Sequence, residues 1–562
     1  MEMNYDTKEI RQIEAELHTE ILPGTEIMAD VGTHHFVKGA HKTVLVPQPS
    51  DNPHDPLNWS SLWKGACITS AAMVTFSQGF GPLALAPMFP ALMESFNCTL
   101  AEAVQFTGIC ILVLGFSNFL WVPISTSFGR RPVYLFSQLI CFGTSIWRAK
   151  ATSYASFMGA CVVNGIGAGP AETIMPAVIA DIFFLHDRGK WNTLYWVVYM
   201  GSLMLGPIIS GAMAENVGWR SFWWFNTALL GTSVIMVITM FPETKFHRLH
   251  PDELEGKATP AESEDKEEQP ATIENTNAET NEDAEKIQQV PTAGSVLPDA
   301  KGLTLEETAA RDPYLGKGTP GKWQWRIYQP NAHPFKSILL DLWIPWKLFA
   351  FPIVEFASFV VSWSCKSSLR CTALQLQAYA DCADLPLGFM NFAILVGALI
   401  GLATAGPFSD WISARSTRRN NGIREPEMRL PAMIPYIIIM YLGNIVVAVG
   451  YQKKWPWEAI VIIGFTCAGI QVAALPAISS TYAVDSYKPV AGSLFVSITV
   501  NKNVWGYGFS KFITPWAEED GFIPPIMTNA SLILLWCLFG ALFWWKGKTF
   551  RRWSKNSKVH RM

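Results

Sequence analysis

Two acidic residues and one basic residue stand inside stretches of the chain that are otherwise apolar: Glu172, Glu355 and Lys502. A charged side chain at membrane depth costs at least about 2.5–3.5 kcal/mol, so such residues are functional candidates by default. Burial favours the protonated form of a carboxyl group, which makes its protonation reversible near neutral pH. We therefore predict that Glu172 or Glu355 carries an exchangeable proton. A structural ion pair or a polar packing contact is the alternative for each residue.

The depth of these residues follows from the apolar segments that contain them. Glu355 lies about twelve residues into the segment 343–363, or roughly 18 Å at 1.5 Å per residue. Lys502 lies about as far into the segment 490–510. We expect both near the midplane of a hydrocarbon core about 30 Å thick, where Lys502 would pair with Glu355. Glu172 precedes Asp181, at the end of its segment, by about nine residues, which places it roughly 14 Å deep.

Further polar and aromatic residues stand at comparable depth. We expect the proton and substrate pathway to include the three charged residues and three amides, Gln78, Asn164 and Gln471. Trp196, Tyr199, Phe76 and Phe80 could stack on a flat or cationic substrate, although most aromatic residues in such segments pack in the core or face lipid. No Ser/His/Asp, metal-ligand or cofactor constellation occurs, so we predict no catalytic residue, no metal and no enzyme activity.

Composition explains what must position these side chains. Of 562 residues, 50% are hydrophobic and 16% are charged, against roughly 25% charged residues in soluble domains. This excludes a soluble multidomain enzyme and favours about twelve membrane spans of about 20 residues each. The net charge of −3 gives no global attraction to nucleic acid, and the 10 Cys show no ligand spacing. The expected spans are 64–92, 104–125, 132–149, 154–180, 192–213, 222–241, 343–363, 388–408, 431–450, 458–481, 490–510 and 528–546.

The spans form two sets of six, and we predict an all-α integral membrane protein built from two six-helix bundles. The expected regions are an N-terminal region (1–61), a first bundle (62–244), a central linker (245–336), a second bundle (337–546) and a basic tail (547–562). The linker is rich in Asp and Glu and has no aromatic residue between 251 and 290, so we expect it to be largely disordered.

Lys and Arg residues cluster in alternate loops, which predicts that both termini lie in the cytoplasm. Two sequons, at Asn97 and Asn529, then fall on or near the opposite side and are glycosylation candidates.

The loop after the second span reads VPISTSFGRR (122–131), in which Gly129, Arg130 and Arg131 are the motif residues. It resembles the G-x-x-x-D-R-x-G-R-R motif of the major facilitator superfamily, with Thr126 in the position of the motif's Asp. The second half has a weaker echo at 406–410, which retains the acid as Asp410. The resemblance implies an inner gate formed by these residues together with Asp181 and Arg188. Ordinary cationic anchoring of the loops is the alternative.

The fifth span resembles the G-x-x-x-G-P-x-x-G-G motif of proton antiporters in the same superfamily. Small residues let helices approach closely, and a proline bends a helix. The corresponding residues are Gly201, Gly206, Pro207, Ser210 and Gly211, with one extra residue in the first spacer and Ser210 in the position of a Gly. Other phrases are similar to a fungal branch of twelve-span drug:proton antiporters: 55–60 (DPLNWS), 181–191, 218–220 (GWR), 241–244 (FPET) and 424–430 (REPEMRL). The stretch 363–387 departs from that branch by being polar and rich in cysteine.

The resemblance implies a proton-coupled efflux pump for a small organic compound that works by alternating access, as a monomer in the plasma membrane. Its energy source would be the proton gradient, because no G-x-x-x-x-G-K-[ST] loop is present to bind ATP and no cofactor is indicated. Its partners would be substrate, protons and lipid. The first alternative is a proton-coupled importer of a cationic molecule such as a polyamine, and the second is a membrane sensor that does not transport.

Overall fold

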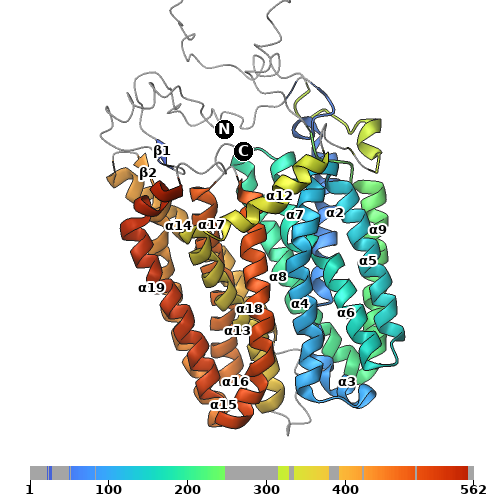
Figure 1. Ribbon diagram of the computed structural model, residues 1–562, viewed down its shortest axis with the longest axis vertical. Helices are drawn as coiled ribbons and strands as arrows, with labels where there is room; N and C mark the ends of the chain where they lie inside the picture. Colours follow the sequence, from blue (N-terminus) through green and yellow to red (C-terminus); the bar gives the residue numbers. More distant parts are fainter. Residues whose placement is uncertain are drawn as a thin grey trace, which may run out of the picture.

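The computed structural model consists of helices packed side by side in two bundles (Figure 1). The structure describes residues 22, 25–27, 50, 52–82, 84–246, 314–327, 329, 334–378, 391–420, 423–487 and 490–554. The acidic core of the predicted linker, 251–290, lies outside these residues.

The N-terminal bundle covers the first six predicted spans and is drawn in blue and green in Figure 1. The helices are α2 (Ser61–Phe80), α3 (Phe89–Phe96), α4 (Leu100–Phe128), α5 (Arg130–Lys150), α6 (Tyr154–Ala168), α7 (Pro170–Ile182), α8 (Leu185–Asn216) and α9 (Trp219–Met240), with short 3-10 turns at Pro56–Asn58 and Ala86–Met88. The predicted span 154–180 is broken into two helices, α6 and α7. The break occurs at Pro170, which lacks the backbone N–H that would continue α6.

The C-terminal bundle, drawn in yellow to red, covers the other six predicted spans. Its helices are α12 (Pro334–Leu348), α13 (Pro352–Ala378), α14 (Asn391–Arg419), α15 (Met433–Gln452), α16 (Trp457–Ala459), α17 (Thr466–Ser486), α18 (Ala491–Asp520) and α19 (Ile523–Ser554). A 3-10 stretch, η4 (Pro426–Ala432), precedes α15, and a π-helical stretch (Ile460–Phe465) joins α16 to α17.

Among the described residues, seven helices are long and apolar enough to cross a membrane, and the bent pair α12–α13 adds an eighth. The remaining predicted spans fall on α2, α5, α18 and the pair α6–α7. These helices are either interrupted or rich in polar residues: α5 contains Gln138 and Arg148, and α18 contains Asn501, Lys502 and Asn503. Within the described residues, each of the twelve predicted spans therefore coincides with a helix or a pair of helices, although not all are strongly apolar.

Several predicted region boundaries need correction. The segment 314–327, assigned to the linker, packs on the N-terminal bundle: Gly318 exchanges backbone hydrogen bonds with Asn58 and Ser60, and Gln324 is fully buried. The helix α19 is kinked at Lys546, the predicted end of the bundle, and a helical stretch continues to Ser554 with Arg551 buried. These segments lie at the end of the molecule that also carries the antiparallel pair β1 (Glu26–Ile27) and β2 (Ile423–Arg424). We call it the linker end.

Candidate transport site

A cavity of about 530 Å³ lies between the two bundles. Helices α7 and α8 of the N-terminal bundle line it from one side, and α13, α14, α17 and α18 line it from the other. The lining reaches from Glu172 and Lys502 to Asp410 and Arg429 at the linker end. A small organic molecule held here would contact both bundles at once.

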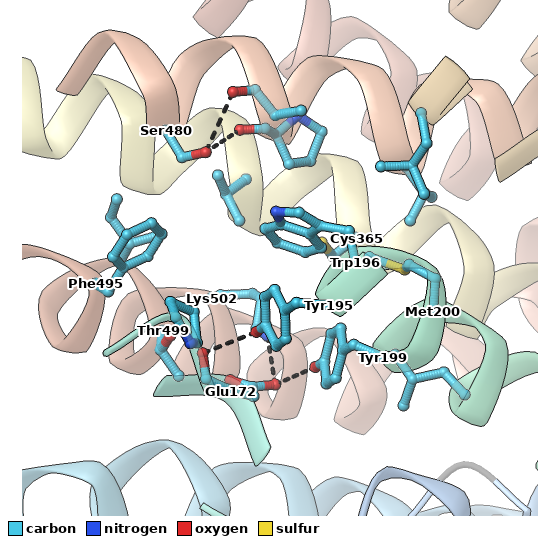
Figure 2. A pocket seen from close by; sticks show the side chains of 18 of the residues that line it. Glu172, Tyr195, Trp196, Tyr199, Met200, Cys365, Ser480, Phe495, Thr499 and Lys502 are labelled. Carbon is cyan, nitrogen blue, oxygen red and sulfur yellow. Dashed lines mark hydrogen bonds and ion pairs between the residues drawn. The ribbon is translucent and has the colours of Figure 1, made fainter. Parts of the chain in front are cut away.

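The cavity wall contains an ion pair that joins the two bundles. Lys502 Nζ on α18 lies 2.6 Å from Glu172 Oε1 on α7. Glu172 is in the first turn of its helix, where the helix dipole favours a negative charge. Tyr199 donates a hydrogen bond from its hydroxyl to the same carboxylate oxygen, and the Tyr195 hydroxyl donates to the Glu172 backbone carbonyl at 3.0 Å. Figure 2 shows these groups gathered around Glu172.

The Glu172 side chain is about nine-tenths buried, with 8% of its surface exposed. Its second oxygen, Oε2, has no hydrogen-bond partner among the described residues. A buried carboxylate oxygen without a hydrogen-bond partner is unfavourable, so Oε2 would favour a donor group from a bound molecule. The carboxylate is thus held through Oε1, and Oε2 is available to accept a hydrogen bond from a bound molecule.

Much of the rest of the wall is aromatic, aliphatic or sulfur-containing, beside polar side chains such as Ser480, Thr499 and Asn503. Trp196 and Met200 come from α8, Cys365 from α13 and Phe495 from α18 (Figure 2). Of the four aromatic residues proposed for stacking, Trp196 and Tyr199 line the cavity. Phe76 and Phe80 instead pack among the aromatic residues of the N-terminal bundle, with Phe80 stacked on Phe222.

Glu355 lies near the start of its helix and not about twelve residues into a span, which corrects the predicted position. The chain bends by 82° between α12 and α13, so the spanning helix begins at Pro352 and not near residue 343. Glu355 is then in the first turn of α13, only about 5 Å from its start. Its carboxylate lies 3.5 Å from the Asn501 amide, whereas Lys502 pairs with Glu172. The expected pairing of Lys502 with Glu355 is wrong.

The three predicted amides lie within the bundles, outside the cavity lining that the described residues form. Gln78 donates to Ser137 Oγ at 2.9 Å, and Asn164 donates to Thr144 Oγ1 at 3.1 Å. Gln471 accepts from the Asn444 amide at 3.2 Å and is fully buried. These amides hold helices of one bundle together, so their role in a substrate pathway remains only a prediction.

At the linker end, Glu243 caps the N-terminus of α5. Its carboxylate accepts backbone N–H bonds from Arg130 (2.8 Å), Arg131 (3.0 Å) and Lys245 (3.0 Å). Gly129 precedes this helix with φ +115°, and a Cβ there would lie 2.2 Å from Glu243 Oε2. Burial raises the pKa of the Glu243 carboxyl, although the three backbone donors favour its ionised form. The motif glycine is therefore required both by its conformation and by the close carboxylate.

The motif arginines fasten the start of α5 to its neighbours. Arg130 Nε lies 3.2 Å from Asp181 Oδ2 at the end of α7. The role of this pair in an inner gate stays a prediction. Arg131 donates to the Ile238 carbonyl at 3.0 Å and stacks over the Trp325 ring. The backbone of Arg188 belongs to α8, but its side chain lies outside the described part of the structure.

The C-terminal bundle carries the counterpart of this cluster. Arg429, in η4 before α15, lies 2.6 Å from Asp410 Oδ1 on α14 and 2.8 Å from Asp485 Oδ2 on α17. Asp410 and Arg429 line the cavity. An arginine at the start of one helix and an acid at the end of another thus recur in both bundles, as expected of an internal repeat.

A family model described as Major Facilitator Superfamily matches residues 71–501. The chain belongs to this superfamily. It is 25% identical to an uncharacterized MFS-type transporter of Schizosaccharomyces pombe, covering 96% of this chain and 94% of that protein. It is also 25% identical to Protein HOL1 of Saccharomyces cerevisiae, covering 96% and 97%.

Two further comparisons cover different extents of the superfamily fold. Citrate exporter 1 of Aspergillus niger is 28% identical over 36% of this chain and 40% of that protein. The crystal structure of a D-xylose–proton symporter shares the fold, with a TM-score of 0.53 at 12% identity over 86% of this chain and 98% of that one. The twelve-helix major facilitator fold expected from the sequence is confirmed.

The antiporter-like motif lies in α8, and its residues differ in what they contact. A Cβ on Gly206 would lie 2.4 Å from the Phe80 carbonyl oxygen, so α8 packs directly on the end of α2 there. Pro207 is inside the helix, and Ser210 donates to its carbonyl at 3.1 Å. Gly201 faces open space, so the close packing expected of it is not found. Gly211 lies in the same helix.

The two sequons differ in accessibility. Asn97 is exposed, in a left-handed conformation at the end of α3, and remains a glycosylation candidate. Asn529 is fully buried inside α19, where an enzyme could not reach it. The prediction that Asn529 is glycosylated is therefore wrong in this structure.

Sequence reasoning missed Tyr195, Cys365 and Phe495, which line the cavity, and Glu243, which caps α5. Tyr195 could have been found, because it precedes Tyr199 by one helical turn and shares its face. Glu243 stands in the FPET phrase noted in the sequence, but its target 113 residues away gives no local signal.

Proposed function

We propose that this protein is a proton-coupled secondary transporter that exports a small organic compound by alternating access, with Glu172 as the proton carrier. The observation that carries the proposal is the Glu172–Lys502 pair, which joins the two bundles in the wall of the cavity. Glu172 lines the cavity, whereas Glu355 is not among the described residues that line it. This supports Glu172 over Glu355 as the proton carrier.

The chemistry follows from charge balance in a buried site. An ionised Glu172 needs a compensating positive charge, because an isolated buried carboxylate is very unfavourable. Lys502 supplies that charge across the bundle interface. A proton on Glu172 removes the need for Lys502, and the tie between the bundles is lost. Proton binding and the relative movement of the bundles are thereby coupled through one carboxylate.

The experiment uses the purified chain in liposomes with a pH-sensitive dye inside. Quinidine, citrate and spermidine are added in turn, and the compound that drives proton movement is kept as the probe. We expect Glu172→Gln to abolish uptake or release driven by a pH gradient while exchange of labelled for unlabelled probe continues. The same amide substitution, Glu355→Gln, is the matched control and should retain pH-driven transport. Full pH-driven transport by Glu172→Gln would contradict the proposal.

Supporting export, Gly206 packs directly on the end of α2 and precedes Pro207, in the part of α8 that resembles the antiporter motif. Membrane vesicles of opposite orientation would separate export from import. We infer that the linker end faces the cytoplasm, since the positive loop residues gather there. We also propose a plasma-membrane location and a monomeric transporter.

A second candidate is import of a cationic compound. It is favoured by Glu172 Oε2, a buried acceptor that has no partner among the described residues, beside the Trp196 and Tyr195 rings. An ammonium group there would replace Lys502 as the counter-ion and gain cation–π contact. Proton movement driven by spermidine but not by citrate, together with accumulation inside cells, would select this candidate.

A further inference from the structure

The helix α12 has two distinct faces. Phe335, Leu339 and Trp343 point outwards, with 75%, 68% and 59% of their surfaces exposed. Ile344 and Leu348, on another face, are buried. Since α12 turns by 82° into α13, it runs roughly across the spanning helices (Figure 1). An apolar outward face on such a helix suits the boundary between lipid headgroups and acyl chains.

Although α12 leads into the C-terminal bundle, it also contacts α4 of the N-terminal bundle. The Thr126 hydroxyl of α4 donates a hydrogen bond to the Asp341 carboxylate of α12. Five residues further along α12, Trp346 stacks on Phe119 of α4, with ring centroids 4.9 Å apart. On the side of its own bundle, the Pro345 carbonyl accepts from Ser497 of α18 at 2.9 Å. The helix therefore bridges the two bundles at the linker end.

Thr126 is the residue at which the loop motif departs from its usual pattern, because a hydroxyl stands in the position of the acid. A hydroxyl cannot provide the negative charge of an aspartate, but Asp341 places a carboxylate directly against it. The C-terminal bundle needs no such supply, because Asp410 stands in its own motif and pairs with Arg429. A carboxylate is thus present beside Thr126, but it belongs to Asp341 of the C-terminal half.

We propose that Asp341 is a positioning residue that fastens α12 to α4 in the state seen here, supplying from the C-terminal half the carboxylate that the N-terminal motif lacks. The contact ties the halves together at the linker end and must be released when they separate there. The three residues 349–351 between α12 and α13 are the connection across which this movement is transmitted. The transport consequence rests on the proposed function, whereas the docking of α12 does not.

The test moves the carboxylate from Asp341 of α12 to position 126 of α4, in two steps. Thr126→Asp places two carboxylates together, so α12 should leave α4. We expect amide hydrogen exchange in the peptide 334–348 of the full-length protein in nanodiscs to quicken at least about fivefold. The double variant Thr126→Asp with Asp341→Thr restores one acid and one hydroxyl, and should return exchange to the original rate. Thr126→Val removes the hydrogen bond without repulsion and should give a smaller increase.

The second readout is proton flux driven by the probe compound. Thr126→Asp should lower the maximal rate by about threefold or more with KM unchanged, and the double variant should restore it. Unchanged exchange in Thr126→Asp, or a folded double variant whose exchange remains fast, would overturn the proposal. Hydrogen exchange needs no transport, so a failure of the transporter assignment is distinguishable from a failure of α12 docking. A thermal unfolding curve shows that each variant is folded.

Discussion

In each bundle an arginine at the linker end is paired with acidic residues, but the acids come from different places in the two bundles. In the C-terminal bundle, Arg429 is held by Asp410 and Asp485, both from its own bundle. In the N-terminal bundle, Arg130 pairs with Asp181, and the position equivalent to Asp410 is Thr126, which meets Asp341 from α12. One cluster is complete within its bundle, and the other depends on a helix of the opposite half.

The clusters also differ in exposure to the transport path. Asp410 and Arg429 line the cavity, and 66% of the Asp410 side chain is exposed. The start of α5 is covered by the segment 314–327, through Trp325 on Arg131 and the Gln324 carbonyl on the Glu243 N–H. Two copies of one motif thus have different surroundings in the two bundles. The C-terminal copy lines the cavity, whereas the N-terminal copy holds the start of α5.

The largest effect should come from breaking the C-terminal cluster. Arg429→Met leaves Asp410 and Asp485 without their shared cation beside the cavity, so we expect proton-coupled transport to fall by about tenfold or more. Arg130→Met should cost less, about threefold, because Asp181 keeps a hydrogen bond from Thr244 at 3.1 Å. Proton flux in liposomes measures both, with Arg415→Met, which stacks on Trp411, as the control. Equal losses in the two variants would remove the distinction between the clusters.

Most of the architecture could be predicted from the sequence, but the ion pair at the cavity could not. Apolar segments and the loop motif predicted twelve helices in two sets, and charge at membrane depth identified Glu172 and Lys502. The partner of Lys502 was misassigned because hydropathy continues through Phe349 and Phe351, which hid the bend and shifted Glu355. Depth along a helix also does not say which way a side chain faces, so Gln78 and Gln471 were placed towards a cavity they do not line within the described residues.

The N-terminal cluster should be more sensitive in stability than in transport. Gly129→Ala introduces a Cβ 2.2 Å from Glu243 Oε2 at φ +115°, which we expect to destabilise the protein by about 1–3 kcal/mol. Gly143→Ala is the matched control: it lies inside α5 with nothing within 4 Å, so the protein should be unaffected or gain up to about 1 kcal/mol. Thermal unfolding in detergent checks both. A similar unfolding temperature for the two variants would show that the carboxylate cap does not depend on this glycine.

The smallest expected effect is a pH dependence of stability that comes from Lys245 in the N-terminal cluster. Burial, with Arg130 nearby, lowers the pKa of Lys245 to about 8 from an ordinary value of 10.5, while its Nζ donates to the Ser127 carbonyl at 3.0 Å. Between these two values the unfolded chain binds the proton more tightly, so this residue makes stability rise as the pH increases from about 8 to 10.5. Lys245→Met should remove that rise and leave the rest of the pH profile in place. Unfolding temperatures at a series of pH values from 7 to 10.5 measure the difference between the two proteins. Superimposable profiles would mean that Lys245 keeps its charge as readily in the folded cluster as in water, and that the α5 end is more open to solvent than its contacts imply.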